Sequence, residues 1–278
     1  MLRVVLLRAL AALLAILATA PLRAAEATPC GPEGRCTIDG GEYRILLPPG
    51  WDGAAPLPVL LHFHGYRENA AEIVAREDLR AFTARRGVLL VVPEGLGGTW
   101  SHPGSPAQAR DELAFVDRIR ADLARRLPVD PRRVLVSGFS QGAAMVWNLA
   151  CHRGHDDAAF LAIAGTFWLP QPGRCPAGAQ RLVQIHGVAD RVVPLEGRAI
   201  RGRFHQGDVF RAMAMMRDAN RCGPETSRTR RAGALVCDIM TGCASGRDLA
   251  LCLHPGGHDF DAAWLDFAWN LINRDEGR

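Results

Sequence analysis

The clearest pattern in the chain is a series of short, continuous apolar runs separated by polar or helix-like segments. Continuous apolar runs are typical of strands that are buried on both faces of a parallel sheet. An additional strand over Glu42–Leu47 alternates in polarity and is predicted to lie at the sheet edge. The buried strands are predicted at Val59–Phe63, Val88–Val92, Val134–Val136, Phe160–Ala164, Leu182–His186, Leu235–Ile239 and Leu249–His254.

Between these runs, apolar residues recur at the spacing of an amphipathic helix, most clearly in Asp111–Leu127. Further helices are predicted over Ala70–Arg86, Ala143–Ala150, Phe210–Asn220 and Ala262–Ile272. The alternation of strand and helix predicts an α/β fold, in which helices flank both faces of a single, mostly parallel sheet. No internal repeat or long linker indicates a second folded domain.

The N-terminus has the pattern of a signal peptide. Arg3 and Arg8 form a basic region, and the apolar stretch Ala9–Ala20 is too short to cross a bilayer. Cleavage after Ala24 or Ala27 would suit the small residues there. We therefore expect a signal peptide over residues 1–27, one domain over residues 28–278, and a secreted or periplasmic protein. After cleavage no stable membrane span is expected; the alternative is that the segment stays as an anchor.

Charge and lysine content exclude several classes of function. Loss of Arg3, Arg8 and Arg23 with the signal peptide would reduce the formal net charge from +4 to +1, so no basic surface for nucleic acid is expected. The chain contains no lysine, which excludes a Walker phosphate loop and Schiff-base chemistry.

All eight cysteines follow the signal segment. An even number of cysteines in an exported protein indicates disulfides, so a disulfide-stabilised fold is expected. Eight cysteines allow 105 complete pairings, and their spacing alone does not choose among them.

A candidate nucleophile lies in Gly138-Phe139-Ser140-Gln141-Gly142, between the strand at Val134–Val136 and the helix at Ala143–Ala150. Gly-x-Ser-x-Gly between a strand and a helix is the nucleophile elbow of the α/β-hydrolase fold. The turn strains the serine backbone, and the flanking glycines allow strand and helix to approach closely. Ser140 is therefore predicted to be a catalytic nucleophile.

A serine nucleophile needs a histidine base and a carboxylate that orients it, and in this fold they follow the serine in the order acid, then histidine. Asp190 follows the predicted strand Leu182–His186, and His258 lies between the last strand and the last helix. We predict the triad Ser140, Asp190 and His258. The alternatives are that Asp190 is only a turn or capping residue and that His258 is only a solvated loop residue.

The predicted oxyanion hole uses the backbone N–H groups of Gln141, directly after the nucleophile, and of Tyr66, in the loop after Val59–Phe63. The alternative is that His64-Gly65 only shapes this turn. We expect no cofactor and no metal. Cys151-His152 lacks the spacing of a closed zinc site, and in an exported protein these cysteines are expected to be oxidised.

Several stretches together resemble the polyhydroxybutyrate depolymerase-like esterases, a group that includes feruloyl and acetylxylan esterases of the first carbohydrate esterase family. The similarity covers most of the chain from Tyr43 to Trp269. The motifs that carry it are Leu57-Pro58-Val59-Leu60-Leu61 with His64-Gly65, Asp111-Glu112-Leu113-Ala114-Phe115-Val116, Val129-Asp130-Pro131-Arg132-Arg133-Val134, Gly138-Phe139-Ser140-Gln141-Gly142-Ala143-Ala144-Met145, His186-Gly187 with Asp190 and Val193-Pro194, and Gly256-Gly257-His258.

The resemblance implies the same triad and a disulfide between Cys222 and Cys243. Once that pair is set aside, we expect Cys30–Cys36, Cys151–Cys175 and Cys237–Cys252 from elimination and proximity. Where members of the group often have cysteine, this chain has Tyr66, and where they have Thr-Trp after the histidine, it has Asp259-Phe260.

These departures indicate a reshaped substrate pocket, for which Trp100, Trp168 and Phe260 are the candidate residues. Packing in the core or in loops is the alternative for the two tryptophans. The sequence shows no appended substrate-binding module, which favours soluble esters or oligomers over crystalline polymer.

The predicted function is an exported serine carboxylester hydrolase that cleaves small-molecule or oligomeric esters through an acyl-enzyme. The alternatives are a serine peptidase of the same fold and a non-catalytic binding protein on this scaffold. The oligomeric state is left open.

Overall fold

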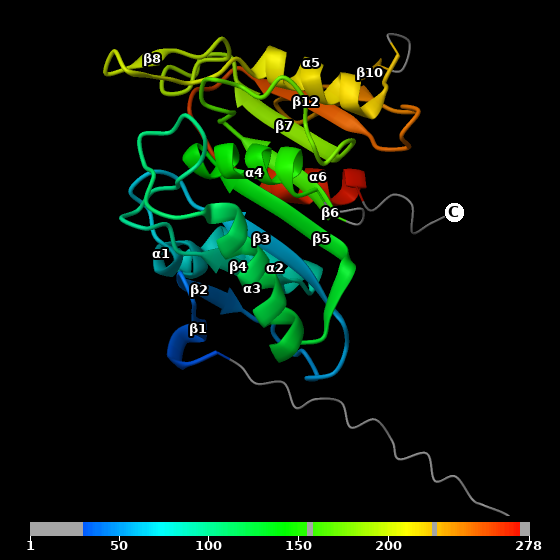
Figure 1. Cartoon of the computed structure of the whole chain (residues 1–278). Coiled ribbons are helices and arrows are strands. Elements are labelled where there is room, and N and C mark those ends of the chain that lie inside the picture. Colours follow the sequence, from blue (N-terminus) through cyan, green and yellow to red (C-terminus); the bar gives the residue numbers. More distant parts are fainter. Residues whose placement is uncertain (1–29, 155–157, 224–226, 273–278) are drawn as a thin grey trace, which may run out of the picture.

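The computed structural model describes residues 30–154, 158–223 and 227–272, so the expected signal segment lies outside the described residues. A ten-stranded sheet runs through the molecule, and helices pack on both of its faces (Figure 1). Its strands are β1 (Arg35–Ile38), β2 (Gly41–Leu46), β3 (Leu57–Phe63), β4 (Leu89–Pro93), β5 (Val129–Phe139), β6 (Ala158–Ile163), β7 (Arg181–Gly187), β10 (Ser227–Ala232), β11 (Leu235–Met240) and β12 (Leu249–His254).

The strands are ordered β1-β2-β4-β3-β5-β6-β7-β12-β11-β10. The central strands, from β4 to β12, pair in parallel, and the two outer strands on each side pair antiparallel. Two short strands, β8 (Ala199–Ile200) and β9 (Phe204–His205), form a separate hairpin. The helices are α1 (Ala70–Ala75), α2 (Glu77–Arg86), α3 (Glu112–Arg126), α4 (Gln141–His152), α5 (Val209–Asn220) and α6 (Ala263–Ile272), with a short 3-10 turn at Pro32–Gly34.

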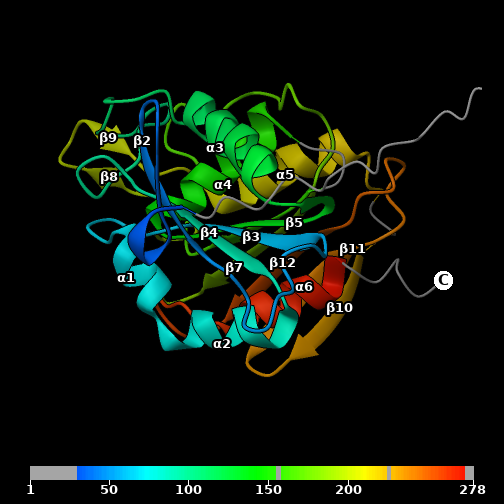
Figure 2. The same cartoon turned by 90° about the horizontal axis from the view of Figure 1, so that it is seen from below.

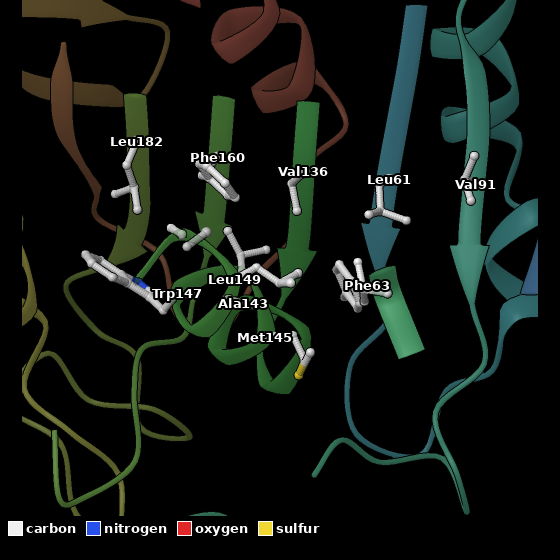
Figure 3. Packing of buried hydrophobic residues seen from close by; sticks show 14 of the residues in the cluster. Leu61, Phe63, Val91, Val136, Ala143, Met145, Trp147, Leu149, Phe160 and Leu182 are labelled. Carbon is white, nitrogen blue, oxygen red and sulfur yellow. The ribbon is translucent and has the colours of Figure 1, made fainter. Parts of the chain in front are cut away.

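Alternate residues of the central strands serve two separate cores, because successive side chains of a strand point to opposite faces. On one face, Leu61, Val136 and Phe160 pack with α3, α4 and α5. Figure 3 shows these strand side chains gathered above α4. On the other face, Leu60 and Leu135 pack with α1, α2 and α6. Viewed along the sheet, the two helical layers lie on opposite sides of it (Figure 2). The predicted α/β-hydrolase architecture is therefore confirmed.

The four disulfides are those expected: Cys30–Cys36, Cys151–Cys175, Cys222–Cys243 and Cys237–Cys252. The last pair joins residues that are directly opposite each other on β11 and β12. No free cysteine remains in the described part of the chain.

Some predicted elements were wrong in extent. The helix predicted over Ala70–Arg86 is two helices, because Arg76 has an extended backbone and its guanidinium pairs with Asp78 at the start of α2. The strand at Glu42–Leu47 is not the edge, because β1 pairs outside it. Sequence analysis missed β1, β10 and the β8–β9 hairpin, which carry no continuous apolar run.

The close approach of α4 to β3 depends on Gly142. A Cβ on this residue would lie 2.6 Å from the Phe63 carbonyl carbon and 2.7 Å from the His64 carbonyl oxygen. We expect Gly142→Ala to lower the free energy of unfolding by about 1–3 kcal/mol, because the backbone at the end of β3 would have to move. Denaturant unfolding measures the effect. Gly173→Ala is the matched control, since its Cβ would meet no atom within 4 Å; equal stability of the two variants would contradict the packing argument.

Candidate active site

Ser140 lies in the tight turn between β5 and α4, at the carboxyl edge of the sheet. Its backbone has φ 56° and ψ −116°, a conformation that is rare for a residue with a Cβ and typically costs about 1–3 kcal/mol. The turn is held by the Ser140 N–H, which donates to the Ile163 carbonyl of β6 at 2.8 Å. This geometry presents the hydroxyl to a cavity beyond the sheet edge.

The structure brings Ser140, His258 and Asp190 together in one hydrogen-bonded chain. His258 Nε2 lies 2.8 Å from Ser140 Oγ, and His258 Nδ1 lies 2.7 Å from Asp190 Oδ2. The Asp190 side chain is fully buried, whereas that of His258 is 16 % exposed. A nucleophile, a base and an orienting acid can act together at such distances.

The pairing of β7 with β12 explains why residues so far apart in the sequence meet. These neighbouring strands run parallel, so the loops that follow them leave the sheet at the same edge. The loops are then joined by backbone hydrogen bonds, from Val188 N–H to His254 O and from Ala189 N–H to Gly256 O. Asp190 and His258 are therefore carried on one connected pair of loops.

The Asp190 carboxylate has other hydrogen-bonding partners besides His258. Its Oδ1 accepts the N–H groups of Val192 and Val193, both at 2.8 Å, and His186 Nε2 lies 3.5 Å from its Oδ2. Burial alone would raise the pKa of Asp190, but hydrogen bonds from His186, His258 and the Val193 N–H outweigh it and hold that pKa well below the usual range. Asp190 is thus an anion across the neutral range.

Behind Asp190 lies a buried polar network that sequence analysis did not assign to the site. Trp147 Nε1 donates to Gln184 Oε1 at 2.8 Å, and Gln184 Nε2 lies 3.0 Å from His186 Nδ1. Because His186 Nδ1 accepts this bond, its Nε2 carries the proton and donates to the Val193 carbonyl at 2.7 Å. The network fixes the turn that presents the acid. The feature of the sequence that could have indicated this network is Gln184, a polar residue within a mostly apolar strand.

The loop after β3 is fixed from several sides. His64 Nδ1 donates to the Gly65 carbonyl at 2.8 Å, and its Nε2 accepts the Gly95 N–H at 3.0 Å. Burial lowers the pKa of His64, so the ring stays neutral in this role. Glu68 accepts the Gly65 N–H at 2.5 Å. The loop that carries Tyr66 is therefore rigid before any ligand binds.

Trp100 belongs to this support and not to the pocket. Its side chain is fully buried, its Nε1 donates to the His64 carbonyl at 2.8 Å, and its ring packs edge-on against Phe63. The structure thus places the Trp100 ring under this loop and not in the wall of the cavity beside Ser140.

Tyr66 and Gln141, the candidate oxyanion donors, both line the cavity beside Ser140. Neither backbone N–H has an acceptor among the described residues. Two unsatisfied N–H groups beside a nucleophile are what an oxyanion hole requires. The Gln141 side chain is held by Thr99, whose hydroxyl donates to Gln141 Oε1 at 2.7 Å.

The cavity has a volume of about 420 Å³, within the range of small-molecule sites. Trp168 lines it, as predicted, together with Ile200 and Phe204 of the β8–β9 hairpin. Thr166 is also in the wall. Its hydroxyl is buried and has no hydrogen-bond partner within the described ranges.

Phe260, another candidate pocket residue, does not line this cavity. Its ring packs edge-on against Phe139, 6.0 Å between centroids, and Phe139 in turn packs against the His258 ring at 4.8 Å. The Arg76 guanidinium covers the outer face of Phe260. The structure thus places Phe260 against Phe139, the residue that packs on the His258 ring, and not in the wall of the cavity beside Ser140.

No group of three or more histidine, cysteine, aspartate or glutamate side chains within residues 30–154, 158–223 and 227–272 is arranged to hold a metal ion. In those same ranges, no helix is both long and apolar enough to cross a membrane.

Comparisons with a family model, with related sequences and with solved structures all match proteins named as esterases. A family model described as Phospholipase/Carboxylesterase matches residues 110–211. Feruloyl esterase C of Emericella nidulans is 29% identical over 209 residues, which are 71% of this chain and 73% of that protein. Feruloyl esterase D of Neurospora crassa is 26% identical over 275 residues, 91% of this chain and 88% of that protein. The solved acetyl xylan esterase from Aspergillus awamori shares the fold, with a TM-score of 0.58, 11% identity and coverage of 83% of this chain and 94% of that one.

The fold, the geometry around Ser140 and these relatives define a carboxylic ester hydrolase of the α/β-hydrolase class. Within that class the chain is similar to feruloyl esterases, which confirms the resemblance to these esterases drawn from its motifs.

Proposed function

We propose that this protein is an exported serine esterase that hydrolyses small esters or short oligoesters through an acyl-enzyme. The observation that carries the proposal is the continuous chain Asp190–His258–Ser140, with contacts of 2.7 and 2.8 Å at the wall of a cavity. Four disulfides and the similarity to feruloyl esterases support an oxidising, extracytoplasmic location.

In the proposed mechanism, Ser140 Oγ attacks the ester carbonyl carbon while His258 Nε2 takes the hydroxyl proton. The imidazolium that forms is stabilised by Asp190, which keeps the proton of Nδ1 in place. His258 then gives its proton to the departing alcohol, and the acyl group remains on Ser140. Water attacks this acyl-enzyme with His258 again as the base. His258 then returns the proton to Ser140 Oγ as its bond to the acyl carbon breaks, and the carboxylic acid leaves.

The negative charge on the carbonyl oxygen would be bound by the backbone N–H groups of Tyr66 and Gln141. Both groups lack other acceptors in the described ranges, and hydrogen bonds around His64 and Glu68 hold the Tyr66 loop in advance. Preorganised donors of this kind need no rearrangement as the charge develops.

For the acyl group, the aromatic wall formed by Trp168 and Phe204 suits a hydroxycinnamoyl or short hydroxyacyl group. The names of the relatives support the first of these substrates. The limited volume of the cavity favours small esters over long chains.

The test is a panel of p-nitrophenyl acetate, p-nitrophenyl butyrate, methyl ferulate, acetylated xylan and hydroxybutyrate oligomers, with a peptide nitroanilide as the comparison. We expect turnover of esters by the oxidised protein without the signal segment, and no turnover of the peptide. Cleavage of the peptide alone would favour a peptidase, whereas inertness toward every ester would defeat the proposal.

A further inference from the structure

The β8–β9 hairpin adds two positive charges to the cavity wall. Arg198 precedes β8, and Arg201 lies in the turn between β8 and β9; both residues line the same cavity as Ser140. No aspartate or glutamate of the described residues lines that cavity. The wall around the nucleophile is therefore apolar and neutral apart from two cations.

These two arginines have no carboxylate of their own. Other arginines near the site have such partners, for example Arg110 with Glu112 and Arg76 with Asp78. For Arg198 and Arg201, no ion pair is found with any carboxylate in the described parts of the chain. A cation in the wall of a binding cavity without an internal counter-ion is free to pair with a ligand.

Arg198 is also held in position. Its Nε donates to the Val192 carbonyl at 2.9 Å and to Gln206 Oε1 at 3.3 Å, which leaves the two terminal nitrogens for another acceptor. Since Val192 follows Asp190 by two residues, this bond ties the hairpin to the turn that carries the acid. An arginine fixed through Nε loses less side-chain freedom when it binds a carboxylate.

A second, independent feature indicates a polar ligand in this cavity. Thr166 is buried, with 2 % of the residue exposed, yet its hydroxyl has no partner among the described residues. A buried hydroxyl without a hydrogen bond is unfavourable, so a ligand oxygen at this wall would satisfy it.

We propose that Arg198 and Arg201 bind the carboxylate of an ester substrate that carries a free acid group, such as a linear oligoester of a hydroxy acid. This inference rests on the proposed function and specifies its substrate class. The Ser140 region binds the ester, the aromatic wall binds the carbon chain, and the hairpin recognises the anionic end.

The experiment compares the linear dimer of 3-hydroxybutyrate, which ends in a carboxylate, with the same dimer ending in a neutral amide. We expect kcat/KM to be about fivefold higher for the acid, a difference in the range that exposed charge pairs contribute. The preference should decrease as salt increases, because both arginines are exposed. Cleavage of the internal ester is followed by chromatography.

Substitutions of the two arginines test whether they cause the preference for the acid over the amide. Arg201→Gln should reduce the ratio of kcat/KM for the acid to kcat/KM for the amide, and Arg201→Glu should reverse it, because only the acid can pair with the charge at this position. Arg198→Gln should act in the same direction. Arg228→Gln, an exposed change on β10, is the control and should leave the ratio unchanged.

Failure of the inference is distinct from failure of the proposed function. Equal rates for the acid and the amide, or a preference that survives Arg201→Glu, would overturn the arginine site while leaving the esterase intact. Absence of hydrolysis of both dimers together with absence of turnover of the simple p-nitrophenyl esters would defeat the esterase assignment itself.

Discussion

Ser140→Ala is expected to lower kcat for p-nitrophenyl butyrate by about 10⁴–10⁶-fold while the protein remains folded. The variant keeps the backbone turn and the hydrogen bond from residue 140 to Ile163, but it has no oxygen to attack the ester. Without an acyl-enzyme, only the remaining donors and binding contacts can accelerate hydrolysis. Steady-state rates and covalent labelling by a fluorophosphonate measure the loss.

A matched control for this change is Ser137→Ala, on the same strand. Ser137 is fully buried and its Oγ lies 2.8 Å from His62 Nδ1, away from the cavity. Its loss should reduce stability by about 1–3 kcal/mol through the unpaired His62, but the folded variant should still hydrolyse esters and accept the label. Labelling that persists in Ser140→Ala would show that the nucleophile is elsewhere.

Asp190→Asn has the second largest expected effect, a decrease in kcat of about 10⁴-fold. An amide at this position can donate a hydrogen bond to His258 Nδ1, which favours the tautomer whose Nε2 carries the proton. That tautomer cannot accept the proton of Ser140. The rate for the same ester measures the effect, and a decrease of less than about tenfold would remove Asp190 from the triad.

The same substitution should change how stability depends on pH. The pKa of Asp190 in the folded protein is held below its ordinary value of 3.8 by hydrogen bonds that outweigh burial. The carboxylate therefore stabilises the fold fully above that ordinary value, and the stabilisation is lost as pH falls below it. Relative to Asp190→Asn, the wild type should lose about 1.4 kcal/mol per pH unit in that acid range.

Denaturant unfolding at pH 7 and at pH 3 measures this difference between the two proteins. Asp218→Asn is the control, because the Asp218 side chain is 80% exposed on α5. The control should follow the wild type at both values. An identical acid dependence of wild type and Asp190→Asn would contradict the hydrogen-bonded, buried carboxylate.

Features that depend on local sequence were predicted well. The elbow around Ser140 needs a buried strand, two glycines and a following helix, and all of these lie within about twenty residues of sequence. The strands β3 and β4 were found within two residues of their ends, because a strand covered on both faces must be apolar throughout.

Features at the edges of the fold were predicted poorly. β10 has the sequence Ser-Arg-Thr-Arg-Arg-Ala and is exposed along most of its length, so no apolar pattern indicates it. The strands of the β8–β9 hairpin have two residues each, too few for any periodicity. The hairpin nevertheless supplies Arg198, Arg201 and Phe204 to the cavity, so a large part of the wall was missing from the prediction.

The three aromatic residues proposed for the pocket show the same limit of prediction from sequence. Trp100, Trp168 and Phe260 all lie on loops at the carboxyl edge of the sheet, and their sequence context is alike. Only the packing separates them: Trp100 is buried against Phe63, Phe260 supports Phe139, and Trp168 lines the cavity. The direction of a ring depends on its neighbours in space.

The sequence by itself determined the fold class, and it predicted Ser140 as the nucleophile and the order of its proposed partners, because the apolar runs and the elbow follow from local periodicity and turn chemistry. The tertiary structure alone decided which loops meet. The parallel pairing of β7 with β12 brings Asp190 to His258, and the hairpin brings two arginines to Ser140. Such contacts join residues tens of positions apart, and the physical reason for them is the packing of the whole sheet and its loops.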